Sequence, residues 1–176
     1  MHVARSTTVE EWGALPEDDD RELVDGTLVE PEVAGFAHGH VVALLTAQLL
    51  AHFRPRGGWV VGDGVRVALG ERRGRVPDAA VFLERPFPTG LVDAIPAIVV
   101  EVLSPGPTNV RRDRIAKVDE YAARGIPQYW IVDPEACTLE IYVLQGGVYA
   151  RVAAADHGVL RVPEHGLELD VDDLFA

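Results

Sequence analysis

The most strongly apolar stretch of the chain covers residues 97–103, in which Glu101 is the one polar residue among seven. β-Branched residues dominate this stretch, and such a pattern predicts a strand buried on both faces of a sheet. An ionised carboxylate that is buried without partners costs several kcal/mol. Glu101 therefore either has an arginine or lysine partner or faces a site that needs negative charge.

A second carboxylate stands at the start of another apolar run. Asp78 directly precedes residues 79–83, all of which are apolar. This run predicts a second strand. Two carboxylates on two neighbouring hydrophobic strands indicate a metal site, because hard cations such as Mg²⁺ take oxygen ligands.

The rest of the pattern alternates between helical spacing and short strand-like runs. The predicted helical segments are a short helix from the capping box at Thr8 to about Ala14, residues 38–53, a helix from Thr108 or Asn109 to Arg124, and one turn within 170–175. The predicted strands are a hairpin over 21–30 that turns at Asp25-Gly26, then 59–61, 65–69, 128–132 and a hairpin of 138–144 with 148–152, whereas 70–74 reads as a charged turn. This order predicts an α/β or α+β fold in a single domain over residues 1–176: one mixed β-sheet flanked by helices, with extra β-hairpins.

Composition narrows the class of protein. The chain has 176 residues, of which 48% are hydrophobic and 25% charged, as in ordinary soluble domains. No uninterrupted apolar run approaches the roughly 20 residues that span a bilayer. The first residues contain no apolar segment of a secretory signal. A single cysteine, Cys137, excludes an internal disulfide. We expect a cytoplasmic protein without a membrane partner.

The charge distribution is uneven. A net charge of −12 argues against non-specific binding of nucleic acid by the whole surface, though a local basic face remains open. Two arginine groups could contact phosphate near the site, although solvated loop charges are the default for both: Arg72, Arg73, Arg75 and Arg111, Arg112, Arg114. Lys117 is the only lysine among 16 cationic residues. Either this is chance, or the position needs a compact ammonium that a guanidinium cannot replace.

These residues together suggest a catalytic metal site. Asp78 and Glu101, with the backbone carbonyl of Val102, could hold Mg²⁺. Such an ion polarises a phosphoryl oxygen, and the reaction then needs a positive group beside it. Lys117 lies at the edge of the packed face of its predicted helix, so its stem can bury while its head reaches the end of a strand. The alternative for Lys117 is an exposed ion pair with Asp113.

Several strings of the chain, in their order and spacing, resemble the Uma2 family of restriction-endonuclease-like proteins in the PD-(D/E)xK superfamily. They are Glu22 to Gly26, Val76-Pro77-Asp78, residues 99–105, Arg112-Asp113 with Lys117 and Tyr121, residues 125–134, and Gly147-Val148-Tyr149. The resemblance spans nearly the whole chain. It departs from the superfamily pattern at Leu103, where the standard motif has lysine.

The resemblance carries further implications. Asp78 and Glu101 would be metal ligands for Mg²⁺ or Mn²⁺, and Lys117 would replace the motif lysine from the following helix. Glu22 would be the acidic residue that enters the pocket from the N-terminal region, with a solvated hairpin charge as its alternative. The resemblance also implies a DNA substrate and a homodimer.

Other polar and aromatic residues receive ordinary roles. His38 and His40 could approach the pocket from a helix start, but surface or capping histidines are commoner. Ser104 reads as a turn residue, because it lacks the Gly-x-Ser-x-Gly setting of a hydrolase nucleophile. Tyr129 and Trp130 lie in a predicted strand and are expected in the core.

Three hypotheses follow for the activity. The first is an Mg²⁺-dependent endonuclease that hydrolyses phosphodiester bonds in DNA. The second is a non-catalytic dimeric binding protein that keeps the nuclease fold, and the acidity of the chain favours it. The third is a metal-dependent hydrolase of a small phosphate ester.

Overall fold

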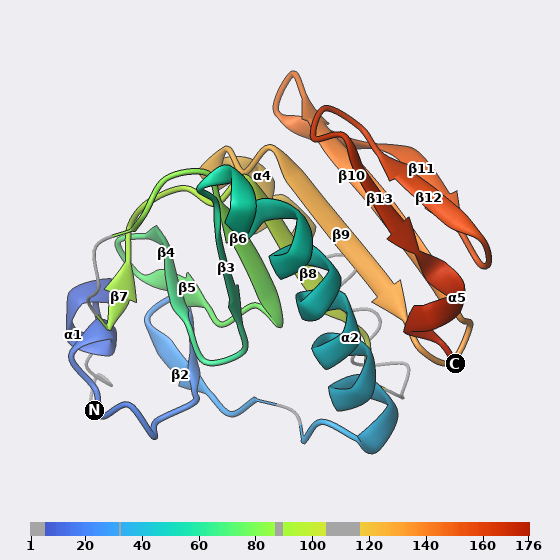
Figure 1. Cartoon of the computed structure of the whole chain (residues 1–176). Helices are drawn as coiled ribbons and strands as arrows, with labels where there is room; N and C mark the ends of the chain where they lie inside the picture. Colours follow the sequence, from blue (N-terminus) through green and yellow to red (C-terminus); the bar gives the residue numbers. More distant parts are fainter. Residues whose placement is uncertain (1–5, 32, 87–89, 105–116) are drawn as a thin grey trace.

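The computed structural model describes residues 6–31, 33–86, 90–104 and 117–176, whose strands form three sheets (Figure 1). The largest has six strands in the order β11 (Val148–Ala155), β10 (Thr138–Gln145), β9 (Gln128–Asp133), β8 (Ile98–Val102), β6 (Ala79–Phe82) and β3 (Trp59–Gly62). β8 pairs parallel with β9 and antiparallel with β6. The predicted mixed sheet is thus confirmed, with β8 in its interior.

A five-stranded sheet lies beside the large one. Its order is β2 (Thr27–Val29), β1 (Glu22–Val24), β5 (Arg73–Arg75), β4 (Arg66–Gly70) and β7 (Leu91–Val92). The predicted β1–β2 hairpin is confirmed, since Asp25 and Gly26 have φ of 49° and 79°, as in a type I′ turn. The single predicted sheet is wrong to this extent, because these strands form a sheet of their own.

The expected turn at 70–74 is partly wrong, because residues 73–75 form strand β5. Glycine is required in its middle for steric reasons. A Cβ on Gly74 would lie 2.1 Å from the ring of Trp12, a residue that is fully buried. The strand therefore packs directly beneath an aromatic ring of the first helix, which its charged sequence does not indicate.

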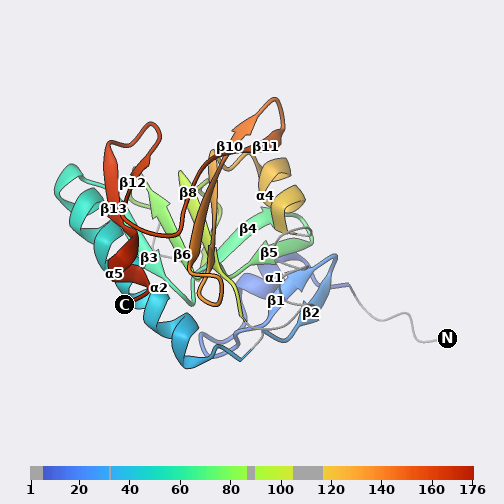
Figure 2. The ribbon, with the colours of Figure 1, turned by 90° about the vertical axis from the view of Figure 1, so that its right-hand side faces the viewer.

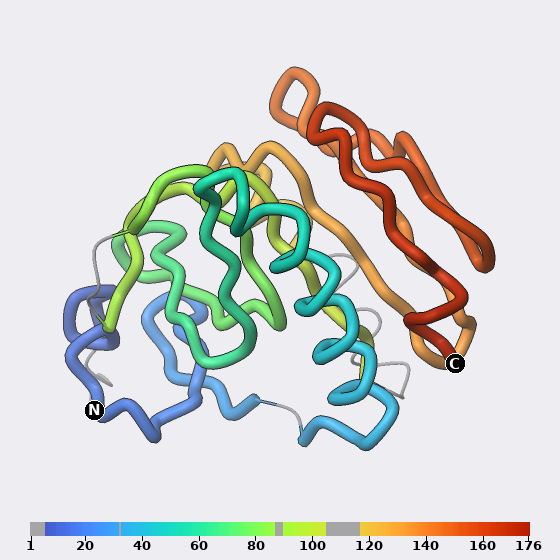
Figure 3. Tube along the Cα trace, viewed as in Figure 1, coloured from blue at the N-terminus to red at the C-terminus, as the bar shows by residue number. Residues whose placement is uncertain are grey.

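The helices follow the predicted pattern. They are α1 (Val9–Gly13), α2 (Phe36–Phe53) with the short η1 (Arg54–Arg56), α4 (Val118–Arg124) and α5 (Val171–Leu174). The capping box of α1 is present, with Thr8 and Glu11 bonding each other's backbone N–H groups. In the trace of Figure 3, α2 turns through η1 into β3, which runs back beside it. The predicted start of the third helix lies outside the described residues.

The two faces of the six-stranded sheet are covered by different elements, as Figure 2 shows from the side. Helices α2 and α5 lie on one face, and α4 and the five-stranded sheet lie on the other. Alternate residues of β8 serve each face. Val100 and its neighbours Ile98 and Val102 pack in the cluster that contains α2. Val99 packs with Tyr121 of α4 on the opposite face. Glu101, which has the same parity as Val99, therefore faces α4.

The chain ends in a hairpin that the sequence analysis did not predict. β12 (Val159–Val162) pairs antiparallel with β13 (Leu167–Asp170), and α5 follows directly. Val162, Leu167 and Leu169 are buried in the same cluster as α2. This hairpin extends the core rather than the functional site.

Among the described residues, one segment, Phe36–Arg56, is long and apolar enough to cross a membrane by length and composition, with a mean hydropathy of 1.2. α2 buries one stripe of four residues against the sheet: Val41, Leu45, Leu49 and Phe53.

Candidate functional site

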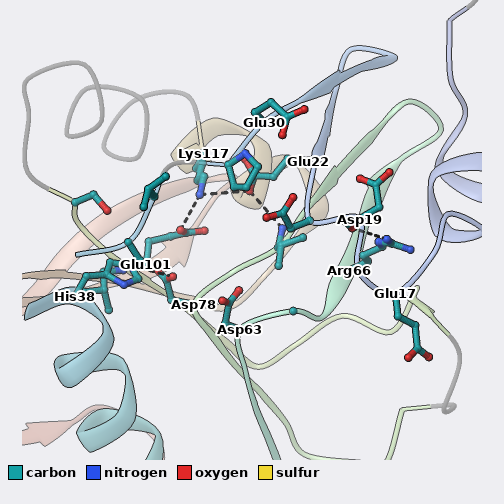
Figure 4. Close-up of a pocket in the computed structure, with 18 residues that line it drawn as sticks. Glu17, Asp19, Glu22, Glu30, His38, Asp63, Arg66, Asp78, Glu101 and Lys117 are labelled. Carbon is teal, nitrogen blue, oxygen red and sulfur yellow. Dashed lines mark hydrogen bonds and ion pairs between the residues drawn. The ribbon is translucent and has the colours of Figure 1, made fainter. Parts of the chain in front are cut away.

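The pairing of β6 with β8 brings two carboxylates to one place. Ala79 lies opposite Val100 in this antiparallel pair, so the register continued by one position sets Asp78 opposite Glu101. Residues directly opposite one another in a sheet point to the same face. Figure 4 shows the two side chains next to each other at one end of a cleft.

Glu101 is held by two donors from the helix that covers its face of the sheet. Lys117, the residue directly before α4, has its Nζ 2.7 Å from Oε2 of Glu101. The hydroxyl of Tyr121 donates to Oε1 over 2.5 Å. Positions 117 and 121 are one helical turn apart, so both side chains reach the same carboxylate. All three residues are buried.

Asp78 is also held through both of its oxygens. The backbone N–H of Val102 donates to Oδ2 over 2.6 Å. On the other side, Nε2 of His38 lies 3.1 Å from Oδ1. His38 comes from the first turn of α2 and lines the cleft. The interpretation of His38 as an ordinary surface or capping residue is therefore wrong, because it contacts the carboxylate directly.

A third carboxylate, Glu22 on β1, lies on the other side of the lysine. Its Oε1 is 3.5 Å from Nζ of Lys117, and its Oε2 accepts a bond of 2.7 Å from Arg75. Arg75 also makes a two-pronged contact with Glu120 of α4, at 2.6 and 2.8 Å. Glu22 is 4% exposed, so the alternative of a solvated hairpin charge is wrong. We call these five residues the buried charge cluster: Glu22, Arg75, Glu101, Lys117 and Glu120.

Arg75 corrects the expectation for the first arginine group. It is 1% exposed and lies behind the cleft, so it is neither a solvated charge nor an edge that contacts phosphate. Arg73, its neighbour on β5, pairs with Asp25 and approaches Glu120. The second group, Arg111, Arg112 and Arg114, lies outside the described residues, as does Asp113, the alternative partner of Lys117.

The environment fixes the protonation of two donors. Burial raises the pKa of Tyr121 well above its ordinary value, and the negative charges of Glu101 and Glu22 raise it further. The hydroxyl of Tyr121 therefore stays protonated and acts as the hydrogen-bond donor to Glu101. Burial alone would lower the pKa of Arg75, but its contact with Glu120 and the charge of Glu22 raise it above the ordinary value. Arg75 thus stays charged between its two carboxylates.

Glu22, Asp78, Glu101 and Lys117 line a cleft with a volume of about 530 Å³. Its walls are strongly acidic, since Glu17, Asp19, Asp20, Glu30 and Asp63 line it together with Glu22, Asp78 and Glu101. Arg66 lines it too, but its guanidinium donates to backbone carbonyls of the loop at Leu15, Pro16 and Asp19. Lys117 is therefore the one lining cation, among the described residues, that contacts the carboxylates facing it.

The donor set fits a hard divalent cation. Tyr121 does not line the cleft, whereas Lys117 does, so Oε2 is the oxygen of Glu101 turned toward it. Asp78 lines the cleft together with both of its partners, His38 and Val102. The buried charge cluster and Asp78 together contain four carboxylates against two permanent cations. One divalent ion would balance this excess. Within the described ranges, no group of three or more His, Cys, Asp or Glu side chains is arranged to hold a metal, so water would complete the coordination.

The structure therefore brings together Asp78, Glu101, Lys117 and Glu22, while their roles stay a prediction. Sequence reasoning missed Glu120, gave no role to Tyr121, and considered Arg75 only as a phosphate contact or a solvated charge. Glu120 and Tyr121 could have been found from their spacing, because they lie three and four positions after Lys117 on one helical face. Arg75 gave no such signal, since its partners come from distant parts of the chain.

Comparisons with known proteins show the family and the fold. The model of the Uma2 family, described as "Putative restriction endonuclease", matches residues 9–172. None of the curated proteins matches the chain. Among solved structures, "a putative nuclease belonging to DUF820 from Anabaena variabilis ATCC 29413" matches with a TM-score of 0.76 and 21% identity, covering 96% of this chain and 97% of that one. At this identity the match shows a shared fold. The family match covers most of the sequence, and the chain belongs to the Uma2 family.

Proposed function

We propose that the protein is an Mg²⁺-dependent endonuclease that hydrolyses phosphodiester bonds in DNA. The observation that carries this proposal is the convergence of Asp78 and Glu101 at one end of the cleft, with the ammonium of Lys117 2.7 Å from Glu101. The family description and the nuclease name of the structural match support the same class of reaction.

The residues divide the work in this proposal. Asp78 and Glu101, with the carbonyl of Val102, hold Mg²⁺ or Mn²⁺, which when bound polarises the phosphoryl oxygen and makes water more acidic. Lys117 orients the attacking water or offsets the negative charge that develops on the phosphate. Val102, through its backbone N–H, and Tyr121 each hold one oxygen of these carboxylates and so fix their orientation.

Cleavage of plasmid DNA tests the proposal. Wild-type protein is expected to cut in Mg²⁺ and to stop when the metal is chelated. Glu101→Ala is expected to lower the rate by at least about a hundredfold, because it removes a metal ligand. Circular dichroism would check that the variant is folded. Glu168→Ala, which removes a carboxylate from an exposed pair on β13, is the control and should cut at the wild-type rate. Metal-dependent cleavage that survives in Glu101→Ala would defeat the assignment.

A non-catalytic binding protein is the second candidate, and the acidity of the cleft favours it. Eight carboxylates line the cleft, and a polyanion must approach them to be cut. Calorimetry discriminates between the candidates, since this second one predicts no binding of Mg²⁺ or Mn²⁺ at millimolar concentration. A hydrolase of small phosphate esters is separated from both by comparing turnover of a plasmid with that of a nitrophenyl ester. The predicted homodimer and cytoplasmic location stay predictions.

A further inference from the structure

Lys117 lies between two carboxylates at unequal distances. Its Nζ is 2.7 Å from Oε2 of Glu101 and 3.5 Å from Oε1 of Glu22 (Figure 4). The first distance is that of a strong charge-assisted hydrogen bond, and the second is longer than one. The lysine is therefore bound to Glu101 and stands beside Glu22.

The oxygen that Lys117 occupies is the one that a metal ion needs. Oε1 of Glu101 is taken by Tyr121 from behind the cleft, which leaves Oε2 as the oxygen on the cleft side. An ammonium and a divalent cation repel one another, so a metal ion on this oxygen weakens its hydrogen bond to the lysine. Lys117 is 4% exposed and lines the cleft. An ammonium with so little exposure is stabilised by a nearby carboxylate when its bond to Glu101 weakens.

Glu22 is built to be that acceptor. Arg75 and the backbone N–H of Val76 hold its carboxylate in place, at 2.7 and 3.3 Å. Arg75 is fixed in turn by two bonds to Glu120. The existing approach of Lys117 to Glu22, at 3.5 Å, is only slightly longer than a charge-assisted hydrogen bond. Glu22 would then contact two cations, Arg75 and Lys117.

We propose that Lys117 moves from Glu101 to Glu22 when a divalent ion binds, and that Glu22 is a positioning residue which keeps the ammonium in the cleft. This inference rests on the proposed metal site. It assigns Glu22 to the lysine rather than to the metal. It also gives a role to Glu22, Arg75 and Glu120, which are linked to one another behind Lys117.

The solitary lysine makes the movement directly observable. Because Lys117 is the only lysine, protein labelled with ¹³C and ¹⁵N in lysine gives side-chain NMR signals from this residue alone. Stepwise addition of Mg²⁺ is expected to shift the Cε and Nζ signals, with a midpoint equal to the Kd from calorimetry. Heat of Mg²⁺ binding without any shift of these signals would overturn the inference and leave the metal site intact. Absence of Mg²⁺ binding would instead overturn the proposed function and the inference with it.

A set of variants separates Glu22 from a direct metal ligand. Glu22→Gln is expected to weaken Mg²⁺ binding about tenfold, because a hydrogen bond between charged groups is lost in the metal-bound state. Lys117→Met is expected to tighten binding, since no ammonium then occupies Oε2. When Glu22→Gln is added to Lys117→Met, the affinity should stay that of Lys117→Met.

Glu120→Gln is the matched control. It removes a carboxylate from the same buried charge cluster, and its carboxylate contacts Arg75 rather than Lys117. Its effect on Mg²⁺ affinity is expected to be smaller than that of Glu22→Gln and equal with and without Lys117. If Glu22→Gln weakens binding equally in both backgrounds, Glu22 acts on the metal itself and the inference is wrong. Should Glu22→Gln fail to fold, the NMR experiment on the wild-type protein decides.

Discussion

Two ion pairs in this protein have nearly the same length and very different surroundings. Arg75 and Glu120 meet at 2.6 Å with side chains 2% and 9% exposed, whereas Arg161 and Glu168 meet at 2.8 Å with side chains 85% and 56% exposed. The first pair belongs to the buried charge cluster, and the second lies on the β12–β13 hairpin. Water screens the second pair and replaces its contacts when it breaks. The contribution of an ion pair to stability therefore depends more on its burial than on its length.

The difference also separates structure from function in this fold. Replacing buried ion pairs by apolar residues is often neutral or stabilising, so stability alone does not explain the buried charge cluster. The cluster surrounds Lys117 and Glu101 at the end of a cleft, and the C-terminal hairpin extends only the core. The proposed metal site, which needs an ammonium in a fixed position, accounts for these buried charges.

The largest effect on stability is expected from Arg75→Met. This change removes the cation between Glu22 and Glu120 and leaves two carboxylates buried without it. We expect the free energy of unfolding to fall by about 3–5 kcal/mol, measured by urea denaturation. Arg161→Met is the matched change in the exposed pair and should cost under about 0.5 kcal/mol. Equal losses in the two variants would break the comparison.

A smaller effect is expected from Tyr121→Phe. The change keeps the ring, which packs 5.3 Å from that of Tyr129, but removes the hydroxyl that donates to Glu101. A hydrogen bond to a charged group contributes about 1.5–3 kcal/mol, so the free energy of unfolding should fall by this amount. Cleavage should slow as well, because Oε1 of Glu101 loses its donor.

Tyr149→Phe is the control for Tyr121→Phe. Its hydroxyl donates to the backbone carbonyl of Ile126 over 2.7 Å, and its ring lies 5.8 Å from that of Tyr129. A neutral bond of this kind contributes about 0.5–1.5 kcal/mol. Tyr149→Phe should therefore lower stability slightly and leave cleavage unchanged. A loss of cleavage in both variants would show that the effect is not specific to the bond between Tyr121 and Glu101.

A small effect is also expected at Arg151, which pairs with Glu140 on the β10–β11 hairpin. Its side chain is 57% exposed, and its contact with Glu140 is screened by water. Arg151→Ala should change the free energy of unfolding by less than about 1 kcal/mol and leave cleavage at the wild-type rate. Thermal unfolding and plasmid cleavage would check both. A loss comparable to that of Arg75→Met would show that burial does not decide how much an ion pair matters.

The sequence predicted the parts of the site that stand out locally. Glu101 interrupts an apolar strand, Asp78 precedes another, and Lys117 is the only lysine, so each differs from its own surroundings. The sheet and the long helix were predictable for the same reason, because apolar periodicity is a local property.

The remaining features depend on distant partners. Arg75 stands in a charged Arg-Gly-Arg segment and looks solvated until Glu22 and Glu120 approach it from a hairpin and a helix. His38 reaches Asp78 only because α2 begins beside the start of β6. β7 has two residues and β5 a single buried glycine between arginines, so neither shows a periodic apolar pattern. Tertiary contacts, rather than local preference, determine these elements.

The central claim is that Asp78 and Glu101 share one divalent ion, and a crystal of the protein soaked in Mn²⁺ tests it most directly. Anomalous scattering would locate the ion without reference to activity. We predict one Mn²⁺ within coordination distance of an oxygen of each carboxylate, with Lys117 drawn from Glu101 toward Glu22. An ion bound elsewhere, or a saturated crystal without an ion between Asp78 and Glu101, would contradict the account.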